Sequence, residues 1–160
     1  RIRSKGHEEA GVAPATTFLD RLNIHSLDGY DVRRTVLGIV AHHLKPTMFF
    51  KAPTPVGDGA FRRLAQKVEL ELLAQFAKAD CHGRAGTFEC DAMDWFIERA
   101  HLLGVEHQPP APLLQGRHVL ALGLSPGPQV GELLRAVYDK QLDGQVTTVD
   151  EAIAELRRLL

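Results

Sequence analysis

The chain has 160 residues, 44% of them hydrophobic, so it can bury the core of one domain or of two small ones. Its formal net charge is -1 and its isoelectric point is near 6.8, which excludes a global positive field that would draw the chain to nucleic acid or to an anionic membrane. An RNA contact would therefore need a local basic patch. No apolar run approaches the roughly 20 residues of a membrane span, and we expect no secretory signal.

Apolar residues recur at helical spacing through the first half of the chain, and no alternation typical of strands is found. One short stripe covers residues 18–22. A second covers residues 32–44 and is closed by Pro46. We expect a loop over 46–59, and then one long helix from about residue 58 to residue 83.

The second half of the chain continues the helical pattern. A helix is predicted over 91–103, with Gly104 as its stop. Residues 108–112 hold three prolines and read as a linker. Thr148 with Glu151 three residues on forms a capping box, which begins a last helix that runs to the end of the chain. The sequence therefore predicts an all-α fold of about seven helices.

The most informative segment, residues 113–144, reads as a short helix, a tight glycine-proline turn and a longer helix. Gly123 ends the first helix, and Pro128 begins the second, where its missing N–H costs nothing. Gly131 lies in the first turn of the second helix and has no side chain to cover the free amides. Because a helix start carries unpaired N–H groups and a partial positive charge, it can receive a phosphate. The alternative is that two packed helices are simply joined by a stiff turn.

Two groups of polar residues could carry chemistry. His7, His42, His43 and Asp80, with His82 close by, lie at the ends of predicted helices and have the donor types that suit a divalent ion. The alternative is that these histidines bond backbone groups or face solvent. The second group is basic, and it is either a nucleic-acid contact or a solvated helix surface with Glu69 and Glu71 as counter-charges. Its members are Arg62, Arg63, Lys67, Arg84 and Arg99, and further polar groups lie around the turn at Arg117, His118, Gln129 and Lys140.

The two cysteines, Cys81 and Cys90, have neither CxxC spacing nor the density of a secreted disulfide scaffold, which favours reduced thiols in the cytosol. Cys81 beside His82 is not a nucleophile–base pair, because adjacent side chains on a helix end point apart. Paired catalytic carboxylates, a nucleophile elbow and a Walker loop are absent from the sequence. We therefore assign no catalytic residue.

Several segments carry a resemblance to a known family. They resemble the C-terminal half of bacterial tRNA nucleotidyltransferases, the CCA-adding and poly(A)-polymerase-like enzymes that have a region of the HD phosphohydrolase type. The segments are GHEEAG (6–11), VAHHLKP (40–46), FRRLAQK (61–67), AKADCHGR (77–84), LLQGRHVLALGLSPGPQVGELL (113–134) and QLDGQVTTVDEAI (141–153). The chain opens without an initiator Met, so it reads as a piece cut from a longer protein.

The resemblance implies a division into a truncated HD-like helical region, 1–107, and a C-terminal hairpin and tail, 108–160. In that family the transfer chemistry sits in a head domain that this sequence does not contain, and this portion holds tRNA. The implied partners are tRNA and the missing head domain, with a homodimer as a further expectation and the cytoplasm as the location. The RNA-facing groups would be Arg63, Lys67, Arg117, Gly127, Gln129 and Gly131.

The resemblance also suggests roles for the histidines. His7 would be one intermediate metal ligand, His42 or His43 another, and Asp80 the last carboxylate. The early His and the His-Asp pair of the family would lie upstream, since no His-Asp dipeptide occurs in this chain. Mg, Mn or Ni would therefore bind in the full-length parent and not tightly here.

Two alternative functions follow from these features. The chain could be the remnant of a metal-dependent phosphohydrolase acting on phosphomonoesters or 2′,3′-cyclic phosphates. It could also be a purely structural scaffold that dimerises through an exposed apolar face. One position departs from the family pattern: His118 stands where the family has an acidic residue, which argues against a capping or RNA-facing role there.

Overall fold

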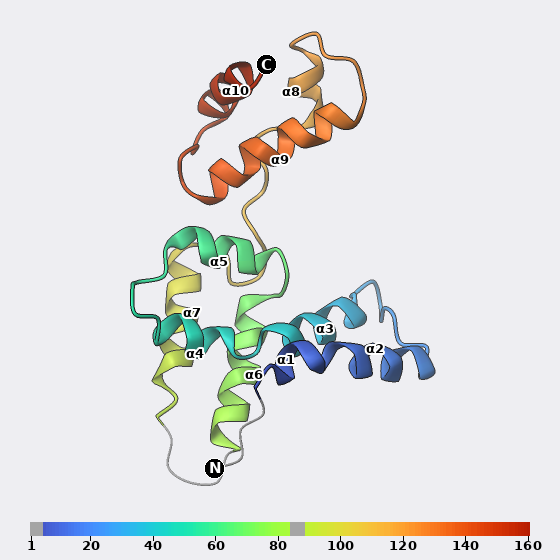
Figure 1. Ribbon diagram of the computed structural model, residues 1–160, viewed down its shortest axis with the longest axis vertical. Helices are drawn as coiled ribbons and strands as arrows, with labels where there is room; N and C mark the ends of the chain where they lie inside the picture. The colour runs from blue at the N-terminus through green and yellow to red at the C-terminus, as the bar shows by residue number, and fades with distance from the viewer. Residues whose placement is uncertain (1–4, 84–88) are drawn as a thin grey trace. The chain divides into compact units, whose positions relative to one another are not determined.

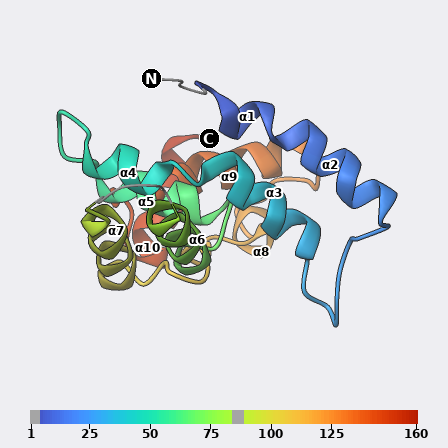
Figure 2. The same ribbon diagram turned by 90° about the horizontal axis from the view of Figure 1, so that it is seen from below.

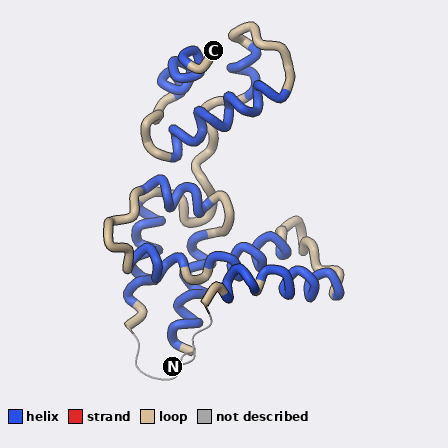
Figure 3. Tube along the Cα trace, in the orientation of Figure 1, coloured by secondary structure: helices blue, strands red, loops and turns tan. Residues whose placement is uncertain are grey.

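The computed structural model describes residues 5–83 and 89–160, and Figure 1 shows their helices. Ten helical segments occur in these residues, eight of them with six or more residues, and the described residues form no strand (Figure 3). The all-α prediction is confirmed. The segments are α1 (His7–Ala10), α2 (Val12–Arg21), α3 (Val32–His42), α4 (Lys45–Phe50), α5 (Asp58–Ala65), α6 (Leu70–His82), α7 (Asp91–Leu102), α8 (Gly116–Leu120), α9 (Pro128–Leu142) and α10 (Val149–Arg158).

The chain divides into two compact units. The first unit comprises 1–56 and 64–109, and the second unit comprises 57–63 and 110–160. Helix α5 therefore contributes most of its length to the second unit. Within the described residues no helix has both the length and the apolar character needed to cross a bilayer.

The first unit is built on three helix pairs. Helix α6 packs along α7, α4 lies against α7, and α2 pairs with α3 (Figures 1 and 2). Its buried side chains include Leu70 and Leu73 from α6 and Phe96 and Ala100 from α7, all with no exposed surface. Within each helix these residues recur at helical spacing, so they lie on one face of α6 and one face of α7.

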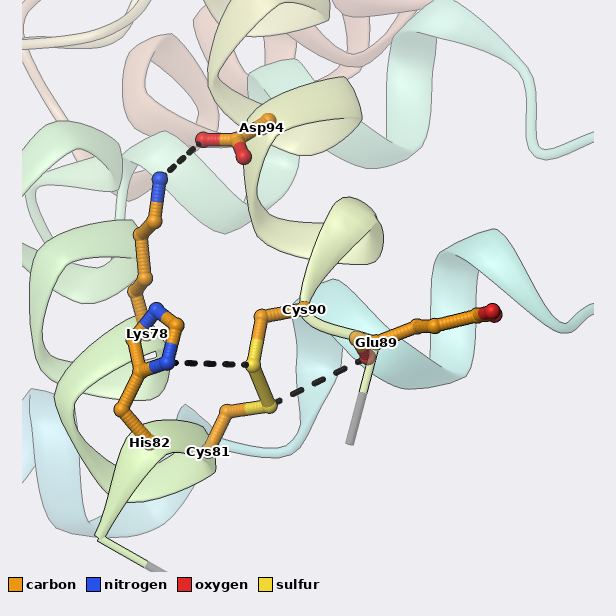
Figure 4. Close-up of a disulfide and its surroundings, with 6 residues drawn as sticks. All are labelled: Lys78, Cys81, His82, Glu89, Cys90 and Asp94. Atoms are coloured by element: carbon orange, nitrogen blue, oxygen red, sulfur yellow. Dashed lines mark hydrogen bonds and ion pairs between the residues drawn. A yellow bond between two sulfur atoms is a disulfide. The ribbon is translucent and has the colours of Figure 1, made fainter. Parts of the chain in front are cut away.

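A disulfide joins Cys81, near the end of α6, to Cys90, which precedes α7 (Figure 4). The expectation of reduced thiols is therefore wrong for this structure. The helices reverse direction between the two cysteines, and their Cα atoms come to 6.2 Å, within the reach of a disulfide. Both side chains are buried, in a cluster with Ala77, Ala92 and Met93. A separation of nine residues matches no local motif, so the sequence carried no signal for this bond.

The long helix predicted over 58–83 is interrupted at residues 66–69, which separate α5 from α6. A tertiary contact is found at this break. Arg34 Nη2 donates to the carbonyl oxygen of Gln66 at 2.8 Å, and that oxygen would accept from Leu70 N–H in a continuous helix. Apolar spacing cannot reveal this contact, because it depends on a residue of another helix.

The loop predicted over 46–59 begins instead with a helix, α4. Pro46 was interpreted as a helix stop, but it lies in the first turn of α4 and is buried. Proline has no N–H, and the first helical turn needs none there, so the same residue that ends one helix starts the next. That prediction is corrected.

After α7 the chain turns at Gly104, whose φ is +62°, and residues 105–109 run back along the start of α6. His107 lies between two carboxylates there: Nδ1 is 3.2 Å from Glu69 Oε1, and Nε2 is 3.5 Å from Glu71 Oε2. Both ring nitrogens face acceptors, so the arrangement favours the imidazolium form. The hydrogen bond to Glu69 is the main cause that raises the pKa of His107, and the charges of Glu71 and Glu106 add to it.

We expect this contact to depend on pH. A raised pKa in the folded state means that the contribution to stability is complete below the unfolded value of 6.5 and is lost as the pH rises through the folded pKa. Urea unfolding at about pH 6 and at about pH 9 measures it. The wild type should lose more stability over this interval than His107→Gln, which cannot titrate. Equal losses in the two proteins would show that the contact contributes nothing.

The second unit packs α8, α9 and α10 around one apolar core, which is formed by Leu114, Val119, Leu133, Val137, Val146, Ala152 and Leu156. The predicted capping box is confirmed: Glu151 N donates to Thr148 Oγ1 at 3.2 Å, and Thr148 N donates to Glu151 Oε2 at 3.3 Å. The proline segment is tied to α9 as well, since Tyr138 Oη donates to Pro110 O at 2.7 Å.

Two arginines of α5 hold the C-terminal end of α9, and we call them the arginine pair. Arg62 Nη1 donates to Leu142 O at 2.9 Å, and Arg63 Nη2 is 2.6 Å from Asp143 Oδ2. A cation at a helix C-terminus is favourable, because the last carbonyls are unpaired and carry partial negative charge. The Arg63 hydrogen bond lowers the pKa of the Asp143 carboxyl. The arginine pair therefore docks α5 on α9 within the second unit.

Candidate nucleic-acid interface

The turn between α8 and α9 has the geometry that the sequence predicts. Gly123 has a φ of +89°, a left-handed conformation that glycine adopts without strain. Gly127 is extended, and Pro128 is the first residue of α9. No side chain caps the N-terminus of α9. The helix therefore begins without a side-chain hydrogen bond from its N-cap residue.

The residues at the start of α9 are open to solvent. Gly127, Gln129 and Gly131 are all exposed. A Cβ atom built at Gly127 or at Gly131 would meet nothing within 4 Å. Val130 N donates to Gly127 O at 3.1 Å, which accounts for one amide of the first turn. Helix starts of this kind are the ends at which anions bind in proteins.

Helix α8 presents Arg117 and His118 before the turn. Arg117 is exposed. His118 points back to its own helix start, where its Nδ1 accepts from Gln115 N at 3.0 Å. The departure from an acidic residue was expected to argue against capping here, and that expectation is wrong. A neutral imidazole supplies the same acceptor at the third helical position as a carboxylate would.

Arg135 is a candidate that sequence reasoning missed. It is exposed on α9, four residues after Gly131, so the two share one face of the helix. Helical side chains lean toward the N-terminus, and Gly131 places no side chain in the way. Arg135 is therefore on the face of α9 that also carries Gly131. The sequence signal for Arg135 was its spacing of four residues from Gly131.

The remaining basic candidates are divided between the two units. Arg63 belongs to the arginine pair of the second unit, while Lys67 lies in the first unit beyond the end of α5 and is exposed. Lys140 is 2.5 Å from Glu155 Oε1, and hydrogen bonds from Arg158 and Lys140 lower the pKa of Glu155 to about 2. Arg84 lies outside the described residues.

Two of the predicted metal ligands meet. His7 Nε2 is 2.9 Å from His43 Nε2, and the ring centroids are 4.9 Å apart. His43 Nδ1 is 2.9 Å from Val40 O, so it carries the proton, and Nε2 of His43 accepts from His7. We call these residues the histidine pair. The same lone pair of His43 could face a metal ion.

The surroundings of His42 and of Asp80 differ from those of the histidine pair. His42 is half-buried, and burial is the main cause that lowers its pKa, followed by the charges of Lys67 and Lys45. Its Nδ1 has no hydrogen-bond partner. Asp80 is exposed on α6, one turn after Phe76, whose ring is 6.0 Å from that of His43. Among the described residues no three histidine, cysteine or acidic side chains form a group that could hold a metal.

Comparison with known proteins confirms the resemblance to tRNA nucleotidyltransferases. The chain is 35% identical over 163 residues to the A-adding tRNA nucleotidyltransferase of Deinococcus radiodurans, a match that covers 96% of this chain and 35% of that protein. It is 30% identical over 158 residues to the CC-adding tRNA nucleotidyltransferase of Thermus thermophilus, covering 98% of this chain and 34% of that protein. The chain thus spans about a third of the length of the curated relatives it matches. No family model matches it, and no solved structure matches it.

Proposed function

We propose that this tRNA nucleotidyltransferase-like chain is a tRNA-binding body and tail part, which holds the RNA by its phosphate backbone. The observation that carries the proposal is the uncapped and exposed start of α9, at Gly127, Gln129 and Gly131. Arg117 before the turn and Arg135, about two turns into α9, are both exposed and add positive charge to this part of the second unit. Contacts of this kind read the shape and backbone of an RNA and not its base sequence.

The charge balance favours a local contact. The net charge of -1 gives no long-range attraction, so affinity must come from the few phosphates that meet this surface. Arg63 is engaged by Asp143, and we therefore place it at the edge of the proposed contact and rest the proposal on Arg117 and Arg135. We assign no catalytic residue to this chain.

The proposal is tested by titrating the chain with folded tRNA at low and moderate salt. We expect a Kd below about 100 µM that weakens as salt rises, because each phosphate contact releases a counterion. Gly131→Glu should weaken binding about tenfold, since it puts a carboxylate over the amides. Arg135→Ala should reduce the salt dependence by about one contact.

Two variants serve as controls. Gly57→Glu adds the same charge at another exposed glycine with open space around it, and Arg157→Ala removes an exposed arginine of α10. Both should bind tRNA as the wild type does. If no salt-dependent binding is found, or if Gly57→Glu and Gly131→Glu weaken it equally, the phosphate contact at α9 is rejected.

The phosphohydrolase alternative has one observation in its favour, the histidine pair, and it needs further ligands that the described residues do not bring to it. A site for Mg, Mn or Ni in the full-length parent therefore stays a prediction, as do the head domain, the homodimer and the cytoplasmic location. The uncapped start of α9 needs no further residues to bind a phosphate. We therefore favour RNA binding over the phosphohydrolase alternative.

A further inference from the structure

A second candidate site lies in the first unit, away from the hairpin in sequence. It is a groove of about 470 Å³, which we call the aromatic groove. The end of α4, the segment that follows it and one face of α7 form its walls. Its lining residues are Phe49, Phe50, Ala52, Pro53, Pro55, Val56, Trp95 and Arg99.

Ring contacts fix the walls of the aromatic groove. The ring of Phe49 is 6.1 Å from that of Phe96, which is fully buried, and this contact anchors α4 on α7. Phe50 meets Trp95 edge to face, with ring centroids 5.5 Å apart and planes at 63°. Phe50 nevertheless keeps 46% of its surface exposed, and Trp95 is half-buried. Two large rings are therefore held in place and still reach solvent.

The charged side chain among the residues that line the aromatic groove is that of Arg99. None of its lining residues is acidic. Arg99 lies one helical turn after Trp95, and the exposed Lys51 follows Phe50 directly in the chain. Pro53 and Pro55 have fixed φ angles, which limits the freedom of the opposite wall. The volume falls in the range of sites that enclose a small ligand.

From these features we infer that the aromatic groove binds an unstacked nucleobase, with the phosphate of that nucleotide toward Lys51 and Arg99. Aromatic faces accept any base by stacking, and neighbouring cations favour the attached phosphate. The inference extends the proposed function, because an RNA is one source of such a base. A free nucleotide is the other source, and it offers the same chemistry.

The experiment uses Trp95, which is the chain's only tryptophan, as a reporter. Its fluorescence is followed while the chain is titrated with AMP, with a single-stranded adenosine hexanucleotide, and with ribose 5-phosphate, which has no base. We expect the hexanucleotide to quench the emission and ribose 5-phosphate to leave it unchanged. Quenching by AMP as well would show that a free nucleotide suffices, and quenching by the hexanucleotide alone would point to RNA.

Phe50→Ala should weaken the binding of the hexanucleotide roughly 5- to 150-fold, the range that loss of a stacking ring causes. Phe18→Ala is the matched control, since Phe18 is 60% exposed on α2 and does not line the groove. It should bind as the wild type does. Lys51→Ala, a change of one exposed side chain, should weaken binding at low salt even if Phe50→Ala disturbs the fold.

The outcomes separate this inference from the proposed function. Absence of quenching by both base-containing probes, or equal effects of Phe18→Ala and Phe50→Ala, overturns the aromatic groove as a base site. If tRNA fails to bind while AMP or the hexanucleotide quenches Trp95, the α9 proposal fails and the groove stands. If tRNA binds as expected and the probes leave the Trp95 emission unchanged, the groove inference fails and the α9 proposal stands.

Discussion

Reduction of the Cys81–Cys90 disulfide is expected to lower the free energy of unfolding of the first unit by about 2.5 kcal/mol. The bond closes a short loop, with nine residues of sequence separation, and opening it restores conformational entropy to the unfolded chain. The two sulfurs are buried against Ala77, Ala92 and Met93, so the folded state should keep its packing when the bond is open. Urea unfolding followed by circular dichroism, with and without a dithiol reductant, measures the difference.

The double variant Cys81→Ser, Cys90→Ser is the control for this prediction. It should show the lowered stability without reductant, and the reductant should have no further effect on it. A wild type whose unfolding midpoint does not move on complete reduction would contradict the prediction. Mass spectrometry after alkylation confirms that the bond was open in that sample.

The same substitution at two helical glycines is expected to act with opposite signs. At Gly38 of α3, a Cβ atom would lie 2.9 Å from Lys67 O and 3.2 Å from Val68 Cβ, and the first of these neighbours is backbone that cannot swing away. Overpacking of this kind costs about 1–3 kcal/mol. Alanine gains roughly 0.5–1 kcal/mol of helix propensity over glycine, which offsets only part of that cost. Gly38→Ala should therefore destabilise the first unit.

Gly131→Ala is the matched change, because Gly131 is also helical but has open space where its Cβ would lie. Here only the helix propensity counts, and we expect the second unit to gain roughly 0.5–1 kcal/mol. Thermal and urea unfolding of both variants, compared with the wild type, gives the two signs directly. A stabilised Gly38→Ala variant would show that α3 does not approach Lys67 as closely as described.

Signals that are local in sequence predicted local structure well. Thr148 and Glu151 indicated the start of their helix, because both halves of a capping box lie within four residues. Gly123 and Pro128 marked the turn for a similar reason. Gly123 adopts a positive φ without strain, and Pro128 lacks only an N–H that the first residue of a helix does not need. The hairpin, on which the proposed site rests, is built from such signals, and this is why its outline could be predicted.

Features that depend on distant residues could not be predicted in this way. The break between α5 and α6 coincides with a hydrogen bond from Arg34 to the carbonyl oxygen of Gln66. The disulfide depends on how α6 and α7 reverse, and the histidine pair depends on α1 reaching α3. Arg63 and Lys67 both fall within the one long helix predicted over 58–83, although α5 ends between them.

The arginine pair has a consequence for the order in which the chain can fold. Arg62 and its acceptor Leu142 O are separated by 80 positions in sequence, as are Arg63 and Asp143. During synthesis from the N-terminus, α5 leaves the ribosome long before α9 exists, so its basic side must stay solvated until then. The second unit is thus a discontinuous domain. The contacts of the arginine pair with residues 142 and 143 join its two chain segments. Its closure is expected to be slower than the formation of its local helices.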